Sequence, residues 1–420
     1  MSTRGGTLPA PAPTGVPEHH ARPPARLPPV VYALALGTFL MGTAEFVVAG
    51  LLPEIAGDLR VGMAQAGMLI TVFAAGMIVG APLMAMLTLR LPRRLTLMLA
   101  LGIFAAGHVV VGLGSSFGLL LAARFLTALA TGAFWAVANV VAADAAGPAS
   151  SSRALGVVGS GAMLANVVGV PLGAFAGQLM GWRGPFWALA VLAVAAMALM
   201  ARCVPHDDGG GGQQTVSVRS ELSALRSGRL WLALAACATT TGGVLSAYSY
   251  ISPLLTERAG LDAGLVPLVL VGFGVGALAG FLVGGRIGDR RPHATTIVAA
   301  AVTTVLLLAI CLLSGYAAPT AALVALLGLF GLGANPVLIS LGVRYAGRAP
   351  TLGSALVVSA FNVGTALGSR IAGYALDSTL RATGPAVVGA AIAALTLVPT
   401  VAMAVIQRRR SASRVVAHHA

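Results

Sequence analysis

Twelve long apolar segments, separated by turn residues and arginines, are the feature that most constrains this chain. Segments of about 20 apolar residues match the ~30 Å apolar core of a bilayer. In lipid the backbone has to satisfy its own hydrogen bonds, so such segments form helices. Charged residues make up only 9% of the sequence, against about 25% in soluble domains. The sequence therefore predicts an all-α integral membrane protein with twelve transmembrane helices.

The predicted spans form two sets of six, which flank the longest connector. We expect a disordered Pro-rich tail at 1–29, a six-helix bundle at 30–201, a cytoplasmic linker at 202–229, a second six-helix bundle at 230–406 and a tail at 407–420. The linker contains four consecutive glycines, which act as a flexible tether. The spans are predicted at 30–52, 62–87, 96–114, 119–143, 155–180 and 184–201, then at 230–252, 264–286, 293–313, 318–343, 352–375 and 384–406.

Arginine placement predicts the orientation of the chain. The tails and the even-numbered connectors hold 20 of the 26 arginines, and the opposite side holds four, namely Arg60, Arg183, Arg258 and Arg381. Such an excess marks the cytoplasmic side of a membrane protein, so both termini are expected there. The arginines lie in short connectors and not on one face among aromatic residues, which argues against nucleic-acid binding despite the net charge of +14.

An internal repeat relates the two sets of spans. The fifth span contains "NVVGVPLGAFAG" and the eleventh contains "NVGTALGSRIAG", which aligns Gly169 with Gly364 and Gly173 with Gly368. Arg90 and Arg290 fall at matching points after the second and eighth spans. Two pseudo-symmetric six-helix halves are typical of a transporter that rocks around a central site.

Several absences argue against an enzyme. The chain has no lysine, and a phosphate-binding loop that cleaves ATP needs one. Uphill transport would therefore use an ion gradient or another subunit. The three cysteines lack metal-ligand spacing, and we find no nucleophile–base pair, so no metal site is expected. A membrane-embedded enzyme or receptor stays as the remote alternative.

At this point the residues resemble a known family. After the second span, Arg90, Arg93 and Arg94 match the loop signature of the major facilitator superfamily in part, and Asp289 and Arg290 match it in the second half. The stretch "GVPLG" is similar to the antiporter motif, and "MGTAEFVVAGLLPEIAGDL", "GAFWAVA" and "GWRGPFWALA" are similar to actinobacterial chloramphenicol exporters. The chain thus resembles the twelve-helix drug:proton antiporters over residues 30–406.

The resemblance implies proton-driven export of a small amphipathic drug, best matched by a chloramphenicol-type antibiotic, across the bacterial cytoplasmic membrane. It implies no cofactor, because the proton gradient supplies the energy, and we expect a monomer in the lipid bilayer. Sugar and arabinose exporters share much of "EFVVAGLLPEIA". Export of a sugar or pathway metabolite by the same fold is therefore the alternative.

One carboxylate, Glu45, lies inside the first span, and Arg124 lies inside the fourth. At 1.5 Å per residue both fall roughly 10 Å below the same membrane surface, and an unpaired charge in the membrane is costly. We therefore expect a Glu45–Arg124 pair that couples proton movement to transport. A structural ion pair, or a Glu45 hydrated near the outer mouth, would explain the same residues.

Helical spacing predicts which residues line a substrate cavity. Arg124, Thr131, Trp135 and Asn139 fall within one arc of the fourth span, although Trp135 would also suit helix packing. The full predicted cavity set is Thr38, Met41, Thr131, Trp135, Asn139, Tyr248 and Tyr250, with at most one of the two tyrosines facing the cavity.

Charged residues at the cytoplasmic ends are predicted to form a gate of ion pairs that closes one conformation. The predicted gate residues are Arg90, Arg93, Arg94, Asp144, Arg153, Asp289 and Arg290, and their alternative role is only to set topology. In the fifth span, glycines permit close helix packing and a proline bends the helix. This antiporter-motif helix comprises Gly169, Pro171, Gly173 and Gly177.

Overall fold

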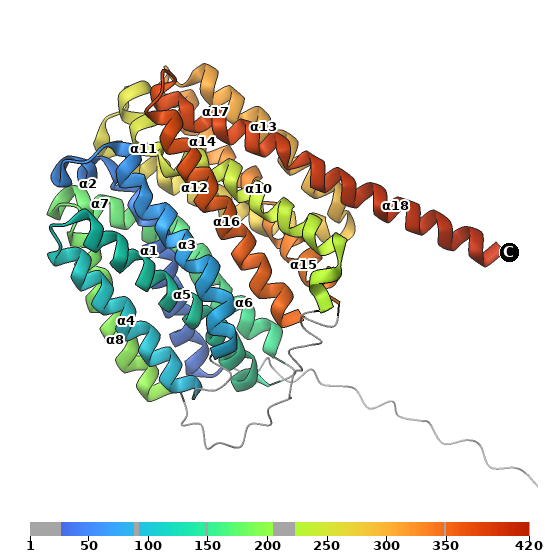
Figure 1. Cartoon of the computed structure of the whole chain (residues 1–420). Coiled ribbons are helices and arrows are strands. Elements are labelled where there is room, and N and C mark those ends of the chain that lie inside the picture. The colour runs from blue at the N-terminus through green and yellow to red at the C-terminus, as the bar shows by residue number, and fades with distance from the viewer. Residues whose placement is uncertain (1–26, 88–91, 148–149, 205–222, 348–349, 420) are drawn as a thin grey trace, which may run out of the picture.

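Figure 1 shows the computed structural model of the chain, which describes residues 27–87, 92–147, 150–204, 223–347 and 350–419. All regular elements in these ranges are helical, and twelve helical stretches are long and apolar enough to cross a membrane. The predicted fold class is confirmed. The predicted tail at 1–29 and the linker at 202–229 lie largely outside the described residues.

The first six spans form the N-terminal half of the bundle. They match the predicted spans to within a few residues, because apolar length defines a span more sharply than its ends. One short helix, α2, was not predicted. The elements are α1 (Pro29–Gly50), α2 (Leu52–Leu59), α3 (Met63–Leu87), α4 (Arg93–Leu113), α5 (Phe117–Ala146), α6 (Ser151–Leu164), the π-helix η1 (Ala165–Gly169), α7 (Val170–Met180) and α8 (Gly184–Cys203).

The last six spans form the C-terminal half. The final helix continues beyond the predicted span end at 406 and runs to His419. The elements are η2 (Ser223–Arg226), α10 (Gly228–Ser249), α11 (Ile251–Pro253), η3 (Leu254–Arg258), η4 (Ala263–Leu265), α12 (Val266–Arg290), α13 (Pro292–Leu313), α14 (Ala317–Gly331), α15 (Asn335–Tyr345), α16 (Pro350–Leu376), η5 (Arg381–Thr383), α17 (Gly384–Leu395) and α18 (Leu397–His419).

Helix packing repeats between the halves. In the N-terminal half α1 packs on α6 and α8, α3 on α5, and α4 on α5 and α8. In the C-terminal half the equivalent helices make the same pairs: α10 packs on α16 and α17, α12 on α14, and α13 on α14 and α17. The most extensive contacts between the halves follow the same relation: α3 packs on α16, and its equivalent α12 packs on η1 and α7.

The aligned glycines occupy equivalent positions. A Cβ atom on Gly169 or Gly173 would collide with Thr43 or Val47 of α1. A Cβ atom on Gly364 or Gly368 would collide in the same way with α10. Glycine at these positions lets each half bring its first and fifth spans close together.

A π-helical segment precedes Pro171 in the fifth span. Proline has no N–H to donate to the preceding turn, and η1, at Ala165–Gly169, ends two residues before it. Such segments widen the helix by one residue. The backbone of Asn166 in η1 lies so close to Gly274 of α12 that a Cβ there would meet the Asn166 carbonyl. The irregular segment is thus where α12 of the other half approaches.

The two ends of the bundle differ in how the halves meet. At the end that carries α2 and α11, here called the α2 end, one buried apolar cluster combines residues of both halves, including Val47, Leu51, Leu245 and Leu270. At the opposite end, here called the arginine-rich end because Arg93, Arg229 and Arg344 lie there, the described residues form separate clusters in each half. The halves are joined at the α2 end.

Candidate functional site

Arg124 is the largest fully buried side chain among the described residues, with 1% of its surface exposed. Its guanidinium bridges two other helices of the N-terminal half. Nη1 donates to the carbonyl of Ala44 at 2.8 Å, Nη2 to that of Glu45 at 3.4 Å, and Nε to that of Leu69 on α3 at 3.4 Å. The guanidinium carbon lies 4.1 Å from the centre of the Phe73 ring. The buried cation is therefore held by backbone oxygens and an aromatic face.

Glu45 lies beside this arginine but does not form an ion pair with it. Glu45 is five residues before the end of α1 and Arg124 seven residues after the start of α5, so both are about 8–10 Å below the α2 end. The predicted depth is correct. The predicted ion pair is not seen, because the guanidinium binds the main chain of α1 instead. None of the described residues donates a hydrogen bond to the Glu45 carboxyl group, which is partly exposed.

One face of α1 points at the C-terminal half. Phe46 makes an edge-to-face contact with Tyr248 of α10, with ring centres 6.4 Å apart. Phe39 and Tyr32 are seven and fourteen residues earlier and so lie on the same face. Phe39 is partly exposed and Tyr32 is 54% exposed. Along this face, the side chains are thus more exposed towards the arginine-rich end.

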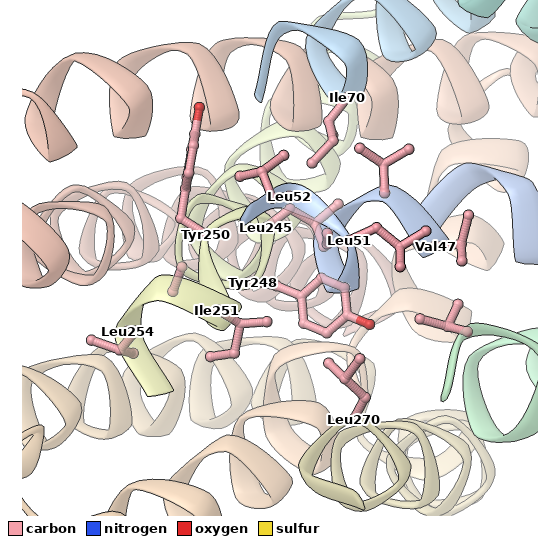
Figure 2. Close-up of a cluster of buried hydrophobic side chains, with 14 of the residues drawn as sticks. Val47, Leu51, Leu52, Ile70, Leu245, Tyr248, Tyr250, Ile251, Leu254 and Leu270 are labelled. Carbon is pink, nitrogen blue, oxygen red and sulfur yellow. The ribbon is translucent and has the colours of Figure 1, made fainter. Parts of the chain in front are cut away.

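Aromatic and aliphatic side chains seal the α2 end above Glu45. Figure 2 shows Tyr248 between Leu51 of α1 and Leu270 of α12. Its ring stacks on Phe273 with centres 4.2 Å apart. The hydroxyl of Tyr250 donates to the carbonyl of Ser369 on α16 at 3.2 Å. We call Phe46, Tyr248, Tyr250, Leu270 and Phe273 the seal.

Polar bonds between α3 and α16 extend the contact of the halves towards the bundle centre. The hydroxyl oxygens of Thr71 and Ser369 are 2.8 Å apart. Ser359 donates to the carbonyl of Ile78 at 3.2 Å. These hydrogen bonds could not be predicted from the sequence, since a single hydroxyl group in a span has many possible partners.

The predicted cavity residues divide into three groups. Thr38, Met41 and Thr131 are at most 3% exposed and pack inside the N-terminal half, so they do not line an open space in this conformation. The Thr38 hydroxyl donates to the carbonyl of Val158 at 2.7 Å, and that of Thr131 to the carbonyl of Thr127 at 2.8 Å.

The second group is accessible. Trp135 is partly exposed, and its buried Nε1 atom has no hydrogen-bond partner. Asn139 is exposed, and its amide donates to the Trp135 carbonyl at 3.2 Å. The third group comprises Tyr248 and Tyr250, both of which are buried in the seal. Neither tyrosine is therefore open to a ligand in this conformation.

The predicted gate is described only in part. Arg93 at the start of α4 forms an ion pair with Asp144 at the end of α5, within one half. Arg94 donates to the carbonyl of Ala201 on α8, and Arg290 is exposed. Arg90 lies outside the described residues, as do the side chains of Arg153 and Asp289.

The antiporter-motif helix packs on α1 directly behind the site. A Cβ on Gly169, Gly173 or Gly177 would collide with Thr43, Val47 or Leu51 respectively. This places the glycine side of the predicted motif against the helix that carries Glu45.

At the α2 end, α2 is tied to its own half by an ion pair that we had not predicted. Arg183, before α8, donates to Asp58 at 2.6 Å and to the carbonyl of Gly114 at 3.1 Å. The hydrogen bond from Arg183 lowers the pKa of Asp58, whereas burial raises the pKa of Glu54 on the same helix. This exposed ion pair holds three connectors together beside the seal.

Comparison with known proteins gives consistent matches. Residues 34–352 match the family described as the Major Facilitator Superfamily. The chain is 37% identical to a chloramphenicol resistance protein of Streptomyces lividans over 86% of this chain and 92% of that one. It is 34% identical to the inner membrane transport protein YdhP of Escherichia coli over 87% of this chain and 93% of that one.

A solved structure shares the fold. It is a bacterial homologue of the human lysosomal transporter Spinster, described as inward-facing and occupied, with a TM-score of 0.71 at 17% identity. The match covers 90% of this chain and 96% of the other.

Proposed function

This chain belongs to the Major Facilitator Superfamily, and we propose that it is a proton-coupled exporter of a small amphipathic antibiotic, a phenicol in particular. It is a multi-pass bacterial membrane protein whose relatives are transporters. In the proposed function it works as a monomer, without a cofactor, and exchanges drug for protons by alternating access.

The observation that carries the proposal is the placement of Glu45 directly under the seal. In the spans, only Glu45 and Asp144 are acids, and Asp144 lies in the last turn of α5. Glu45 is partly exposed, has no hydrogen-bond partner among the described residues, and lies beside a buried cation. A partly exposed carboxyl group that lies beside a buried cation, next to an apolar seal, suits proton exchange with alternating sides.

The arginine excess supports a cytoplasmic arginine-rich end. With that orientation the conformation described above is open to the cytoplasm and closed to the outside. Drug would enter along the exposed face of α1 near Phe39, and parting of the seal would release it outwards. Glu45 would then take up a proton from outside and return it to the cytoplasm once the seal has formed again.

The hydrogen-bond partners of Arg124 support this cycle. While the seal is formed, its guanidinium donates to the carbonyls of Ala44 and Glu45. Those atoms are in the same turn of α1 as the carboxyl group, so a small movement would exchange a backbone oxygen for an ionised carboxylate. Protonation of Glu45 would remove that attraction and favour the backbone partners.

Phenicol tolerance tests the substrate. Production of the protein in a sensitive bacterium should raise the inhibitory concentration of chloramphenicol several-fold, since active export lowers the drug concentration inside the cell. Cells that produce the Glu45→Gln variant at the same level serve as the control and should stay sensitive. If the wild-type protein changes only the response to sugars, the substrate is a sugar and the phenicol proposal is wrong.

A crosslink across α3 and α16 tests alternating access. In a variant whose three cysteines are replaced by alanine, Thr71→Cys and Ser369→Cys place two thiols where the hydroxyls are 2.8 Å apart. Oxidation should stop drug export almost completely, because the halves could no longer part there, and dithiothreitol should restore it. The control is Thr71→Cys alone. Full export by the oxidised double variant would show that this contact does not open during the cycle.

A further inference from the structure

A cavity lies at the arginine-rich end, away from Glu45. It has a volume of about 430 Å³ and is formed where η2, the start of α10 and the end of α15 meet. All of it belongs to the C-terminal half. Its lining consists of Arg226, Ser227, Gly228, Arg229, Arg344 and Tyr345.

Three of the six lining residues are arginines, and none of the three forms an ion pair in the part of the chain that the structure describes. Arg229 is held in place from one side: Nη2 donates to Oε1 of Gln407 on α18 at 2.7 Å, and the guanidinium lies over the Tyr345 ring at 4.3 Å. Its Nε atom is buried and has no hydrogen-bond partner.

A helix terminus makes the cavity still more positive. The 22-residue helix α10 begins at Gly228, so the positive end of its dipole is at the cavity wall. Like charges gathered in this way repel one another, and a bound anion would relieve the repulsion.

The neighbouring tryptophan indicates the level of the cavity in the membrane. Trp231, in the first turn of α10, is 54% exposed, and its indole N–H donates to the carbonyl of Leu225 at 2.8 Å. Exposed tryptophans of membrane helices lie at the level of the lipid headgroups. The cavity beside it is therefore at the height of lipid phosphates and next to the lipid-facing surface.

We propose that this cavity binds the phosphate of an anionic phospholipid headgroup. Guanidinium groups bind phosphate oxygens through paired, charge-assisted hydrogen bonds, and basic pockets between helices are suited to anionic lipids. The lipid phosphate bridges Arg344 on α15 and Arg229 on α10, and through Gln407 it also acts on α18. The lipid thereby ties the end of α15 and the start of α10 to the middle of α18.

Native mass spectrometry of the purified full chain tests the proposal with phosphatidylglycerol as the probe. Wild-type protein should retain phosphatidylglycerol in preference to phosphatidylcholine. The double variant Arg226→Gln, Arg344→Gln should bind phosphatidylglycerol roughly tenfold or more weakly, as expected for the loss of two cations near a headgroup. Both side chains are exposed and make no ion pair, so the variant should elute as a folded monomer.

Arg202→Gln is the matched control, because Arg202 is an exposed arginine at the end of α8 in the other half. It should bind phosphatidylglycerol as the wild type does. Equal retention by the double variant, or no preference over phosphatidylcholine, would overturn the proposal. A thermal shift with inorganic phosphate alone, and none with phosphatidylglycerol, would assign the cavity to a soluble phosphate and overturn the lipid assignment.

Discussion

Glu45→Gln is expected to abolish drug-driven proton movement and to leave a folded protein that still binds drug. Glutamine keeps the shape of the side chain but cannot release a proton. The Glu45 carboxyl group has no hydrogen-bond partner among the described residues, so the substitution breaks no hydrogen bond in the described part of the chain. Uphill export should therefore fall at least a hundredfold, while thermal stability should change little.

Proteoliposomes with an imposed pH gradient provide the measurement. Proton flux is followed with a pH-sensitive dye inside the vesicle, and drug flux with radiolabelled chloramphenicol. Wild-type protein should move protons only when drug is present on the opposite side. The Glu45→Gln variant should show no proton flux, yet it should still exchange labelled for unlabelled drug, because exchange needs no net proton transfer.

Glu257→Gln is the matched control, since Glu257 is an exposed acid at the α2 end, in η3. It should couple protons to drug as well as the wild type. If the Glu45→Gln variant retains drug-driven proton flux, Glu45 takes no part in coupling. The partly exposed carboxyl group of Glu45 would then have no role in transport. The exchange assay separates a lost proton site from a lost drug site.

The sequence predicts the fold of this protein well because bilayer thickness and apolar length leave little freedom. The spans, the two halves and the alignment of Gly169 with Gly364 follow from hydropathy and repeat alone. The depth of Glu45 and Arg124 is also predictable, since a helix rises by a fixed amount per residue. Each of these properties depends only on position along the chain.

The sequence does not predict which partner a buried side chain points to, or which conformation of the transport cycle the protein adopts. Arg124 is long enough to reach either a carboxylate or a carbonyl of α1, and depth does not choose between them. The spacing predicts that at most one of Tyr248 and Tyr250 faces the cavity, and neither is open to it, because the halves close over both at the α2 end. Two conformations of one transporter bury similar amounts of apolar surface, so composition does not distinguish them.

Arg124→Ala is expected to eliminate export, with the protein still inserted in the membrane. The substitution removes hydrogen bonds to Ala44, Glu45 and Leu69, and hydrogen bonds from a charged group stabilise by about 1.5–3 kcal/mol each. Those bonds join α1 and α3 to α5 at the level of Glu45. We expect the thermal midpoint to fall by several degrees and proton coupling to disappear.

Arg124→Lys distinguishes charge from bridging. Lysine keeps the cation but carries its three donors on one nitrogen in place of the planar fork, so it loses the spacing by which three guanidinium nitrogens reach two carbonyls of α1 and one of α3. If bridging matters, the lysine variant should insert, regain part of the lost stability and still couple protons poorly. Its proton and drug fluxes are measured in the same vesicles as those of Glu45→Gln, with Arg202→Ala as the control for loss of an exposed arginine. Wild-type export by Arg124→Ala would mean that the buried guanidinium only supports packing. Glu45 would then exchange its proton without a switching cation.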